Sequence, residues 1–443
     1  MTASITPAQP RAGSAFRFTG TIADATATRD RALFDRGLAL DDHVRSRTAE
    51  IIQRVRRDGD RALRDLAYSL DGVALEQLEV PRAVWRDAAA IVAPELRAAL
   101  ERAARNIRRA HEAWRPTAGE VETEPGVLVG RRPDPLERVG IYAPGGRALY
   151  PSSVLMGAIP ARVAGVGEIV MCSPPGPSGM PAPIMLAAAE VSGVDRVFSV
   201  GGAGAIAALA YGTESVPRVD RIVGPGNAYV AAAKLQVASD TSIDAPAGPS
   251  ELLVIADHSD AADAVAREVV AQAEHDPDAA VIVIATAPDI AAAIGRAVQC
   301  LVPFEKRADI IAASLNARGA LLVAPDVAAA IRFSNDWAPE HLLLAVTNPS
   351  AALRTVRNAG TVCLGTTSSV VFGDYITGAN HVLPTGGAAR RYSGLSTLDF
   401  VRWTTYQRVT DAGAQALAGD TALLATAERL PGHAAAARRL APR

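Results

Sequence analysis

The sequence predicts an α/β protein with two Rossmann-like parallel-sheet domains, helical additions at the N-terminus and a small helical tail at the C-terminus. The first observation is length, because 443 residues exceed what a single hydrophobic core usually organises. The second is a rhythm of short apolar runs alternating with Ala-rich helical segments, which is typical of βα units. This rhythm occurs twice, so two domains are favoured over one long sheet.

The N-terminal third of the sequence is expected to add helices before the first sheet. Residues 1–28 begin with a polar stretch rich in Ala, Pro and Ser, without the basic and apolar regions of a secretory signal, and we expect a flexible leader. From about 42 to 115, charged residues alternate with Ala, Leu and Val at helical spacing. This pattern predicts amphipathic helices with solvated charged faces.

The two βα series are read from their apolar runs. The first contains VGIYA, EIVMCS, RVFSV and RIVG, separated by expected helices at 152–165, 181–194, 203–212 and 228–239. After APAGPSE the second contains LLVIA, AVIVIA, ALLVA, LLLAV and TVCLG, with expected helices at 260–274, 288–300, 326–334 and 350–358. From about residue 381 the strand pattern is lost, which predicts the helical tail.

Charge and hydropathy argue against nucleic acid and membranes as binding partners. A formal net charge of −2, with charges of both signs scattered along the chain, gives no basic footprint for nucleic acid or anionic membrane. No stretch reaches the roughly 20 apolar residues of a membrane span. The three cysteines, Cys172, Cys300 and Cys363, form no C-x-x-C pair, so a reducing cytoplasm fits. A small-molecule partner is expected.

Two segments carry candidate metal ligands. Gln272 and His275 lie three residues apart at the end of an expected helix, and on their own they are more simply read as an exposed helix end. Asp374 follows the run TVCLG in a Gly-rich segment, where we expect it at a strand end of the kind that builds α/β sites. Oxygen and imidazole ligands together suit a catalytic zinc with open positions.

The stretch DWAPEH places two bases side by side, Glu340 and His341. Pro339 disfavours helix at the residue before it, so the two bases are expected to begin the strand that contains LLLAV. A salt-linked pair on the surface is the alternative. A fixed and partly desolvated position would instead tune both groups for proton transfer near neutral pH.

Two Gly-rich turns could contact a cofactor. Gly202-Ala-Gly204-Ala-Ile-Ala207 matches G-x-G-x-x-A between a strand and a helix, as in dinucleotide-binding turns. It is not in the first βα unit of its domain, however, and crowded Gly and Ala are common at tight turns. The run GPGNAY offers Asn227 and Tyr229, either as a structural turn or as a cofactor contact.

The sequence resembles the histidinol dehydrogenase family, enzymes of the last two steps of histidine biosynthesis. The resemblance runs from about residue 30 to the end through motifs in matching order: IYAPGGRALYPSS, GPGNAYV, IDAPAGPSE, AQAEHDPD, WAPEH, GDYITGANHVLPTGGAARRYSGLS and ERLPGH. It implies NAD-dependent, four-electron oxidation of L-histidinol through L-histidinal to L-histidine, with one Zn²⁺ per subunit, in a cytoplasmic homodimer.

The resemblance also implies roles for individual residues. The catalytic bases would be Glu340 and His341. The zinc ligands would be Gln272, His275, Asp374 and His433, the last from the partner subunit. The substrate contacts would be Ser250, Gln272, His275, His341, Asp374, Glu428 and His433. The NAD contacts would be Tyr142 and Asn227, while Gly204 stands where the family usually has a Gln that touches the cofactor.

We accordingly expect four regions. Residues 1–28 would form the leader, 29–140 and 247–380 the first α/β domain with the bases and zinc ligands, 141–246 the second domain on the NAD side, and 381–443 a tail exchanged in the dimer. Two other functions remain open. A dehydrogenase of another small alcohol, such as one resembling sulfopropanediol dehydrogenase, would keep bases and zinc, although Glu428 suits a cationic amine better than a sulfonate. A zinc hydrolase would use Glu340 as its base and need no NAD.

Overall fold

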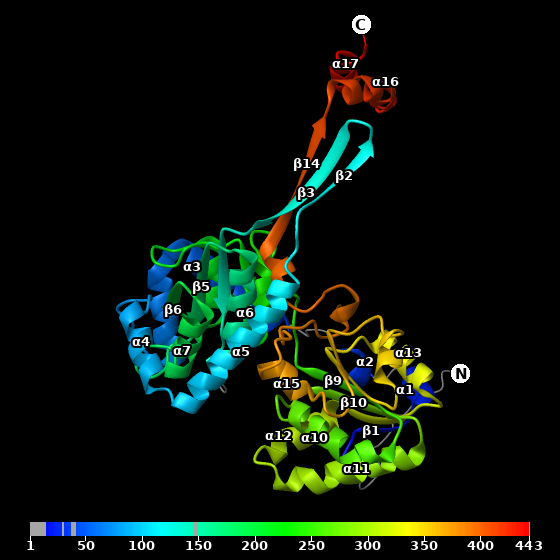
Figure 1. The fold of residues 1–443 in the computed structure, drawn as a ribbon. Coiled ribbons are helices and arrows are strands. Elements are labelled where there is room, and N and C mark those ends of the chain that lie inside the picture. Colours follow the sequence, from blue (N-terminus) through cyan, green and yellow to red (C-terminus); the bar gives the residue numbers. More distant parts are fainter. Residues whose placement is uncertain (1–14, 29–30, 37–40, 146–148, 443) are drawn as a thin grey trace, which may run out of the picture.

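The computed structural model describes residues 15–28, 31–36, 41–145 and 149–442. Two parallel sheets organise the chain, and a long antiparallel arm extends from them (Figure 1). The α/β class with two parallel sheets and a helical C-terminal tail is therefore confirmed. None of the helices in the described part of the chain is long and apolar enough to cross a membrane.

The six-stranded sheet is parallel throughout and has helices on both faces. Its strand order is β1 (Phe18–Thr21), β11 (Gly319–Val323), β10 (Ala280–Ala285), β9 (Glu251–Ala256), β12 (His341–Ala345) and β13 (Thr361–Leu364). One face is covered by α10 (Ala262–Ala273), α11 (Pro288–Leu301), α12 (Ala308–Arg318) and α15 (Val370–Tyr375). The other is covered by α1 (Ile22–Thr28), α2 (Arg31–Phe34), α13 (Val327–Trp337) and α14 (Pro349–Leu353).

The central strands of this sheet are buried on both faces, which explains their uninterrupted apolar runs. All residues of β9, β10 and β12 are buried. Alternate side chains of each strand enter opposite cores, as the pleat requires: Leu252 and Val254 pack with α10, whereas Leu253 and Ile255 pack with α13.

The five-stranded sheet is also parallel. Its order is β6 (Arg196–Ser199), β5 (Glu168–Ser173), β4 (Arg138–Tyr142), β7 (Arg221–Val223) and β8 (Ser242–Ile243). One face packs against α4 (Arg82–Ile91), α5 (Pro94–Ala113), α6 (Pro151–Ala164) and α7 (Pro183–Ser192). The other packs against α3 (Asp42–Leu66), α8 (Gly202–Tyr211) and α9 (Ala228–Val237).

The N-terminal helices differ from the expected domain division in their packing. Residues 29–140 were expected with the domain that carries the bases, but α3, α4 and α5 bury their apolar stripes on the five-stranded sheet. Residues 18–28, expected in a flexible leader, form β1 and α1, because Phe18 and Ala25 are buried against the six-stranded sheet. Residues 1–14 of the expected leader lie outside the described residues.

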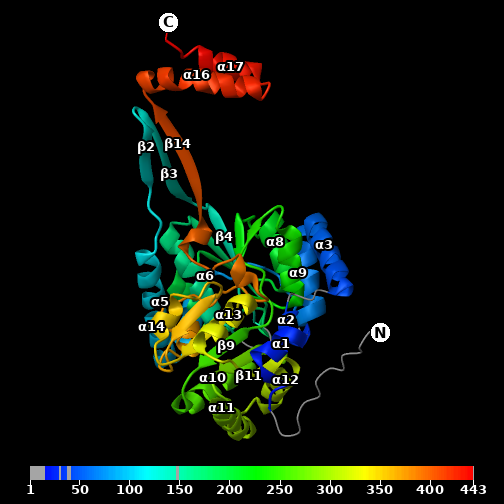
Figure 2. The same cartoon turned by 90° about the vertical axis from the view of Figure 1, so that its right-hand side faces the viewer.

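The arm is a three-stranded antiparallel sheet of order β14 (Val401–Val409), β3 (Val127–Pro135) and β2 (Gly119–Glu124). It carries α16 (Asp411–Ala427) and α17 (Pro431–Arg438) at its end, away from both parallel sheets (Figures 1 and 2). The helical tail was expected, but the strand β14 within it was not. Most side chains of β2 and β14 are exposed, so these strands lack the apolar alternation that marks a half-buried sheet.

Short 3-10 and π turns complete the described secondary structure: η1 (Ala67–Asp71), η2 (Ser259–Ala261), η3 (Val302–Phe304), η4 (Ala388–Arg390) and η5 (Thr397–Phe400).

Candidate active site

The two expected bases lie together at the amino end of one strand, β12. His341 is the first residue of β12 and pairs with Leu252 of β9, while Glu340 directly precedes the strand. Ser250 precedes β9 in the same way. The chain leaves β9 towards β10 on one side and later returns as β12 on the other, so this is where the strand order reverses. Ligands of open α/β sheets usually bind at the carboxyl ends of such strands, but here the polar side chains gather at the amino ends.

Glu340, His341 and Asp374 form a contiguous buried group. Glu340 is 6% and His341 5% exposed. The His341 Nδ1 atom lies 3.4 Å from Glu340 Oε2, and its Nε2 atom lies 3.6 Å from Asp374 Oδ1. The expectation of a fixed and desolvated position for the two bases agrees with this burial, whereas a surface ion pair does not.

The main chain of Glu251 fixes both bases. Its N–H donates to Glu340 Oε2 at 2.7 Å, and its carbonyl oxygen accepts from His341 Nδ1 at 3.0 Å. Since Nδ1 donates here, Nε2 is the imidazole nitrogen directed to Asp374 and to the site. The buried Nε2 atom has no hydrogen-bond partner, as expected of a group that meets a ligand.

The electrostatics of this group favour a charged imidazole. Burial lowers the pKa of His341, but the carboxylates of Glu340 and Asp374 on either side raise this pKa well above its usual value. Burial in turn raises the pKa of Asp374, but His341 and the nearby imidazoles of His381 and His275 outweigh it and hold that pKa below its usual range. The lowered pKa of Asp374 and the raised pKa of His341 thus favour a carboxylate beside an imidazolium.

Asp374 reaches the site through a short helix. We expected it at the end of a strand, but it lies near the end of α15, which runs back from β13 to the amino edge of the sheet. The helix forms here because Ser369 and Val370 begin it beside α10, where Val370 N–H donates to Glu268 Oε2 at 3.1 Å. The prediction that Asp374 lies at a strand end is thus wrong, although Asp374 does lie beside His341.

His381 links Asp374 to the other domain and was missed from the sequence. One imidazole nitrogen, Nδ1, lies 2.7 Å from the main-chain oxygen of Asp374, and Nε2 lies 3.0 Å from Ser153 Oγ at the start of α6. The signal was its place in the run GANHVLPTGG, close behind Asp374. Through Ser153, the carboxyl edge of the five-stranded sheet meets the amino edge of the six-stranded one.

The expected metal ligands from this chain approach the same place. Gln272 lies in the last turn of α10, which packs against α15, and His275 lies two residues beyond the end of α10. The charge of His275 contributes to the lowered pKa of Asp374. The Gln272 side chain is 3% exposed, and its Nε2 atom has no hydrogen-bond partner, so the amide is a candidate to turn towards a ligand. Within the described residues, no three His, Cys, Asp or Glu side chains form a complete metal cluster. The donors present fit a zinc ion only in part, and a further ligand is needed.

A cavity opens beside these groups. It has a volume of about 430 Å³ and is lined by His341 and Asp374 together with residues of β13, α15 and the segment after it. Such a volume suits a small organic substrate. Cys363 also lines the cavity, but burial raises the pKa of its thiol to about 11, so this thiol is not a ready nucleophile at neutral pH.

The expected NAD contacts lie at the carboxyl ends of β4 and β7, where the strand order of the five-stranded sheet reverses. Tyr142 ends β4, and its hydroxyl accepts from Gly202 N–H at 3.1 Å at the start of α8. Asn227 follows β7 and caps α9, since its Oδ1 atom accepts from the N–H groups of Tyr229 and Val230. Asn227 is exposed, so its amide can still meet a ligand. A dinucleotide typically binds at such a switch point.

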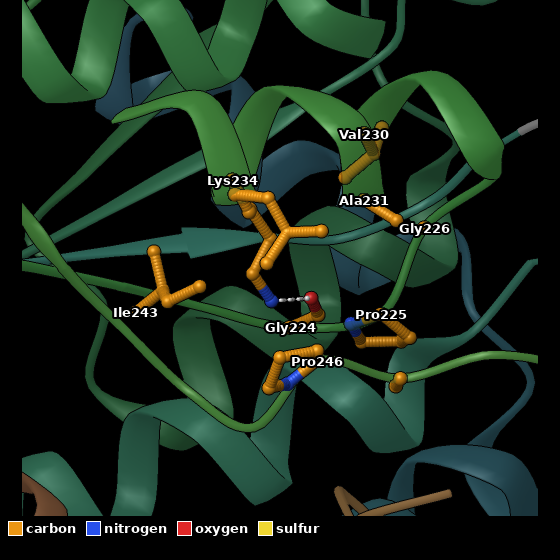
Figure 3. A pocket seen from close by; sticks show the side chains of 10 residues that line it. Gly224, Pro225, Gly226, Val230, Ala231, Lys234, Ile243 and Pro246 are labelled. Carbon is orange, nitrogen blue, oxygen red and sulfur yellow. Dashed lines mark hydrogen bonds between the residues drawn. The ribbon is translucent and has the colours of Figure 1, made fainter. Parts of the chain in front are cut away.

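The turn between β7 and Asn227 is held by a buried ion pair. Lys234 of α9 pairs with Asp244 and donates from Nζ to the carbonyl oxygen of Gly224 at 3.0 Å (Figure 3). Asp244 accepts from Gly224 N–H at 2.7 Å. Gly224 has a φ of 115°, and a Cβ atom there would collide with the main-chain oxygen of Tyr142. This position therefore requires glycine, and the turn is rigid.

The motif G-x-G-x-x-A suggested that Gly204 lies in a turn between a strand and a helix, but the structure places it inside a helix. It is a buried residue inside α8, and a Cβ atom built on it would point to Leu66 of α3 at 3.0 Å. A longer side chain here would first meet α3. A cofactor contact at Gly204 remains a prediction.

Two expected site residues are not brought to the bases. Glu428 ends α16 and His433 lies in α17, and both are exposed at the end of the arm (Figures 1 and 2). Ser250, by contrast, is half-buried directly beside Glu251, and its carbonyl oxygen accepts from Ala280 N–H at 3.0 Å.

Known proteins resemble this chain over nearly its whole length. The family model described as Histidinol dehydrogenase matches residues 35–440. The histidinol dehydrogenase of Methanosarcina barkeri is 44% identical over 418 residues, which is 94% of this chain and 96% of the relative. That of Halobacterium salinarum is 46% identical over 415 residues, covering 94% of this chain and 97% of the relative.

A solved structure gives the same result for the fold. The crystal structure of histidinol dehydrogenase from Elizabethkingia anophelis superposes with a TM-score of 0.92 at 34% identity, and the match covers 97% of this chain and 99% of that one. Sequence and architecture agree, and the chain belongs to the histidinol dehydrogenase family, NAD-dependent oxidoreductases of the last two steps of histidine biosynthesis.

Proposed function

We propose that this chain oxidises L-histidinol to L-histidine through L-histidinal with NAD, and that Glu340 and His341 are its proton-transfer groups. The observation that carries the residue assignment is the buried group of Glu340, His341 and Asp374 beside a cavity sized for a small substrate. The family match favours histidinol over the other alcohols and over the hydrolytic reaction considered from the sequence.

The overall reaction explains why two bases are needed. The alcohol gives one hydride to NAD and one proton to a base, and the aldehyde then adds water. The hydrate gives a second hydride to a second NAD and further protons to the base, leaving the carboxylate. His341 Nε2, which faces the site, suits the alcohol and hydrate protons. Glu340 suits the activation of water.

His341 must lose its proton before it can accept one. In the chain alone, Glu340 and Asp374 stabilise the imidazolium. A cation bound at Asp374 would neutralise one of these two carboxylates and lower the pKa of His341 towards the neutral range. Ligand binding and activation of the base would thus be coupled through Asp374.

We further propose one zinc ion, held by Gln272, His275 and Asp374 of one subunit and by His433 of the partner. Support comes from the unpartnered Gln272 amide, from the proximity of His275 to Asp374, and from the donor set of imidazole nitrogens and oxygens. When bound, the zinc would orient the substrate as a Lewis-acidic template. The protein groups around it then move the protons.

The remaining contacts are proposed by position. Ser250, Glu428 and His433 would bind the substrate together with the zinc-side residues, with the carboxylate of Glu428 on the substrate's ammonium group. Tyr142 and Asn227 would contact NAD at the switch point of the five-stranded sheet. We infer a homodimer with shared active sites, because Glu428 and His433 stand on an arm that leads away from the sheets of their own chain.

The decisive test is the yield of NADH per histidinol consumed. The purified protein, supplied with histidinol and excess NAD, is expected to form about two NADH per histidinol, since passing from alcohol to acid removes two hydrides. A yield near one would reject the second oxidation. Conversion of histidinol without NADH, or no conversion by a folded, zinc-supplied sample, would reject the proposed function.

A further inference from the structure

A buried arginine, Arg36, contacts two residues next to the proposed bases in sequence or in space, Trp337 and Glu251. We propose that Arg36 is a positioning residue that holds Glu340 in its working orientation through two neighbours, Trp337 and Glu251. This inference rests on the proposed role of Glu340. It concerns a residue 304 positions away from Glu340, whose place could not be read from the sequence.

Arg36 contacts Trp337 in two ways. Its Cζ atom lies 3.4 Å from the centroid of the Trp337 ring, and an Nη atom donates to the Trp337 carbonyl oxygen. The indole Nε1–H of Trp337 donates in turn to the carbonyl oxygen of Leu33 at 2.8 Å. Arg36 is 6% and Trp337 1% exposed. The hydrogen bonds and the cation–π contact that join the N-terminal segment to Trp337 therefore lie in surroundings shielded from water, where such contacts are strong.

The short segment that leads from Trp337, the last residue of α13, to Glu340 has a strained backbone. Ala338 has a φ of 55° and is fully buried, and Arg429 is the other non-glycine residue with positive φ in the described part of the chain. A residue with a side chain adopts this conformation at a cost of about 1–3 kcal/mol and keeps it where surrounding contacts impose it. Ala338 leads through Pro339 directly to Glu340. The contacts of Arg36 with Trp337 therefore bear on the conformation that aims Glu340.

The second route runs through Glu251. Its carboxylate forms an ion pair with Arg36 and accepts from Gly386 N–H at 2.8 Å, while its main chain donates to Glu340 and accepts from His341. Burial raises the pKa of Glu251, the Arg36 charge opposes this, and the nearby Glu340 carboxylate raises the pKa further. Two acids thus share one buried region. Arg36 forms an ion pair with one of them, and the main chain of that same residue holds Glu340 and His341.

A purely structural role for Arg36 would look different in experiments. A buried ion pair often adds little to stability beyond what apolar residues would give, although removing one partner alone is costly. Loss of a structural pair lowers the folded fraction and leaves the turnover of folded molecules unchanged. Loss of a positioning residue lowers kcat in folded molecules and leaves KM nearly unchanged.

The test compares Arg36→Met and Arg36→Lys with Arg318→Met in the full-length, zinc-supplied protein. Arg318 is a matched control, because it also touches the N-terminal segment, by donating to the Asp35 carbonyl oxygen at 3.4 Å, while its ion pair is with Asp278 and not with Glu251. Arg36→Lys keeps the charge beside Glu251 and loses the planar group over Trp337. It serves as the deciding variant if Arg36→Met does not fold.

Two readouts are expected to move together. In folded Arg36 variants, kcat should fall by up to about 100-fold, the scale of a small misplacement of a reacting group, with KM for histidinol and NAD changed little. Hydrogen exchange of peptides covering 336–342 and 249–253 should become faster, whereas Arg318→Met should match wild type in both readouts. In a Glu340→Gln background, Arg36→Met should add little further loss of kcat, because both changes act on the same group.

Each contrary result has a definite meaning. Wild-type kcat in a folded Arg36 variant, or unchanged exchange in both peptides, would overturn the positioning role while leaving the proposed function intact. Losses that multiply fully in the Glu340→Gln background would show that Arg36 does not act through Glu340. If the wild type itself failed to oxidise histidinol, the proposed function would fall, and the exchange comparison would still decide whether Arg36 holds this segment.

Discussion

Glu340 and His341 are adjacent in sequence but occupy different environments. Glu340 accepts a main-chain hydrogen bond on Oε2, whereas His341 is held at Nδ1 and presents Nε2 to Asp374 and the cavity. The two side chains are therefore held differently: the imidazole Nε2 faces Asp374 and the cavity, whereas one carboxylate oxygen of Glu340 is engaged by the main chain, which supports the separate roles proposed for them. Different steps should respond to the loss of each.

The first prediction concerns this division. Glu340→Gln should slow the oxidation of histidinal by about 100- to 10,000-fold, the usual contribution of a general base, because this half-reaction consumes water. Oxidation of histidinol to histidinal should be impaired far less, while His341→Ala should impair both half-reactions. Stopped-flow NADH formation from each substrate measures the two rates. Asp336→Asn, which removes an exposed carboxylate four positions earlier, is the control, and equal losses for Glu340→Gln in both half-reactions would reject the assignment.

A second residue-scale prediction concerns the metal. Removing zinc with a chelator should abolish turnover, because the groups at Gln272, His275 and Asp374 then have no ion to share with the substrate, and adding zinc should restore it. Far-ultraviolet circular dichroism checks that the fold persists, as expected for ligands carried on packed helices. A preparation free of metal by elemental analysis and still fully active would contradict the proposed zinc role.

The sequence singled out Glu340 and His341 but not the residues that hold them in place. The Trp-Ala-Pro lead-in and the following apolar strand showed that Glu340 and His341 begin a buried strand, as the structure has it. Glu251 and Arg36 escaped notice because their importance comes from tertiary contacts across 90 and 301 positions of chain. A single sequence carries no local pattern for such contacts.

At the scale of elements, the sequence predicted strands correctly where burial leaves a clear pattern of apolar residues. Every apolar run of the two βα series is a strand of a parallel sheet, since strands covered on both faces must be continuously apolar. The arm strands were missed because β2 is exposed along its whole length and has no apolar face. Helix α15 was missed because six residues with Gly373 inside carry little helical signal.

The third prediction tests the turn that follows β7. Gly224→Ala should destabilise the protein by more than the roughly 1–3 kcal/mol of an unfavourable φ, because the new Cβ atom also collides with the Tyr142 main chain. The shift of β7 against β4 should also raise the Michaelis constant for NAD. Chemical denaturation and NAD titration measure the two effects. Gly72→Ala is the matched control, since its φ is 71° but its Cβ would meet nothing within 4 Å. Equal destabilisation by both substitutions would show that the collision is relieved by small shifts.

At the scale of the whole molecule, the arm with its two helices is the part that packs least against the rest of the chain (Figures 1 and 2). Three strands, of which β2 and β14 are mostly exposed, carry α16 and α17 outwards, and Leu423 and Leu424 of α16 are 70% and 67% exposed. Isolated sheets and exposed apolar helix faces of this kind gain stability by packing on another surface. The same helices bear Glu428 and His433, which we propose to complete the site of a second chain. In a dimer, a second copy of the chain would cover the exposed apolar surface of the arm, and its site would receive Glu428 and His433.

The last prediction follows from this exchange. In a two-fold dimer each site would take Glu340 and His341 from one chain and His433 from the other. His433→Ala and His341→Ala chains should each be inactive alone. When they are unfolded together and refolded, each mixed dimer should contain one site with both lesions and one intact site. Random pairing makes about half of the dimers mixed, so recovery should approach roughly a quarter of wild-type activity if the sites act independently.

The control for this experiment is refolding each variant alone and the wild type in parallel, with the fraction of mixed dimers measured by native mass spectrometry after labelling one variant with heavy isotopes. If His433 served its own chain, each mixed dimer would carry one lesion in each site, and no activity would return. Mixed dimers without recovered activity, from a protocol that restores the wild type, would therefore return His433 to its own subunit. The arm would then have to fold back onto the sheets that it leaves in Figures 1 and 2.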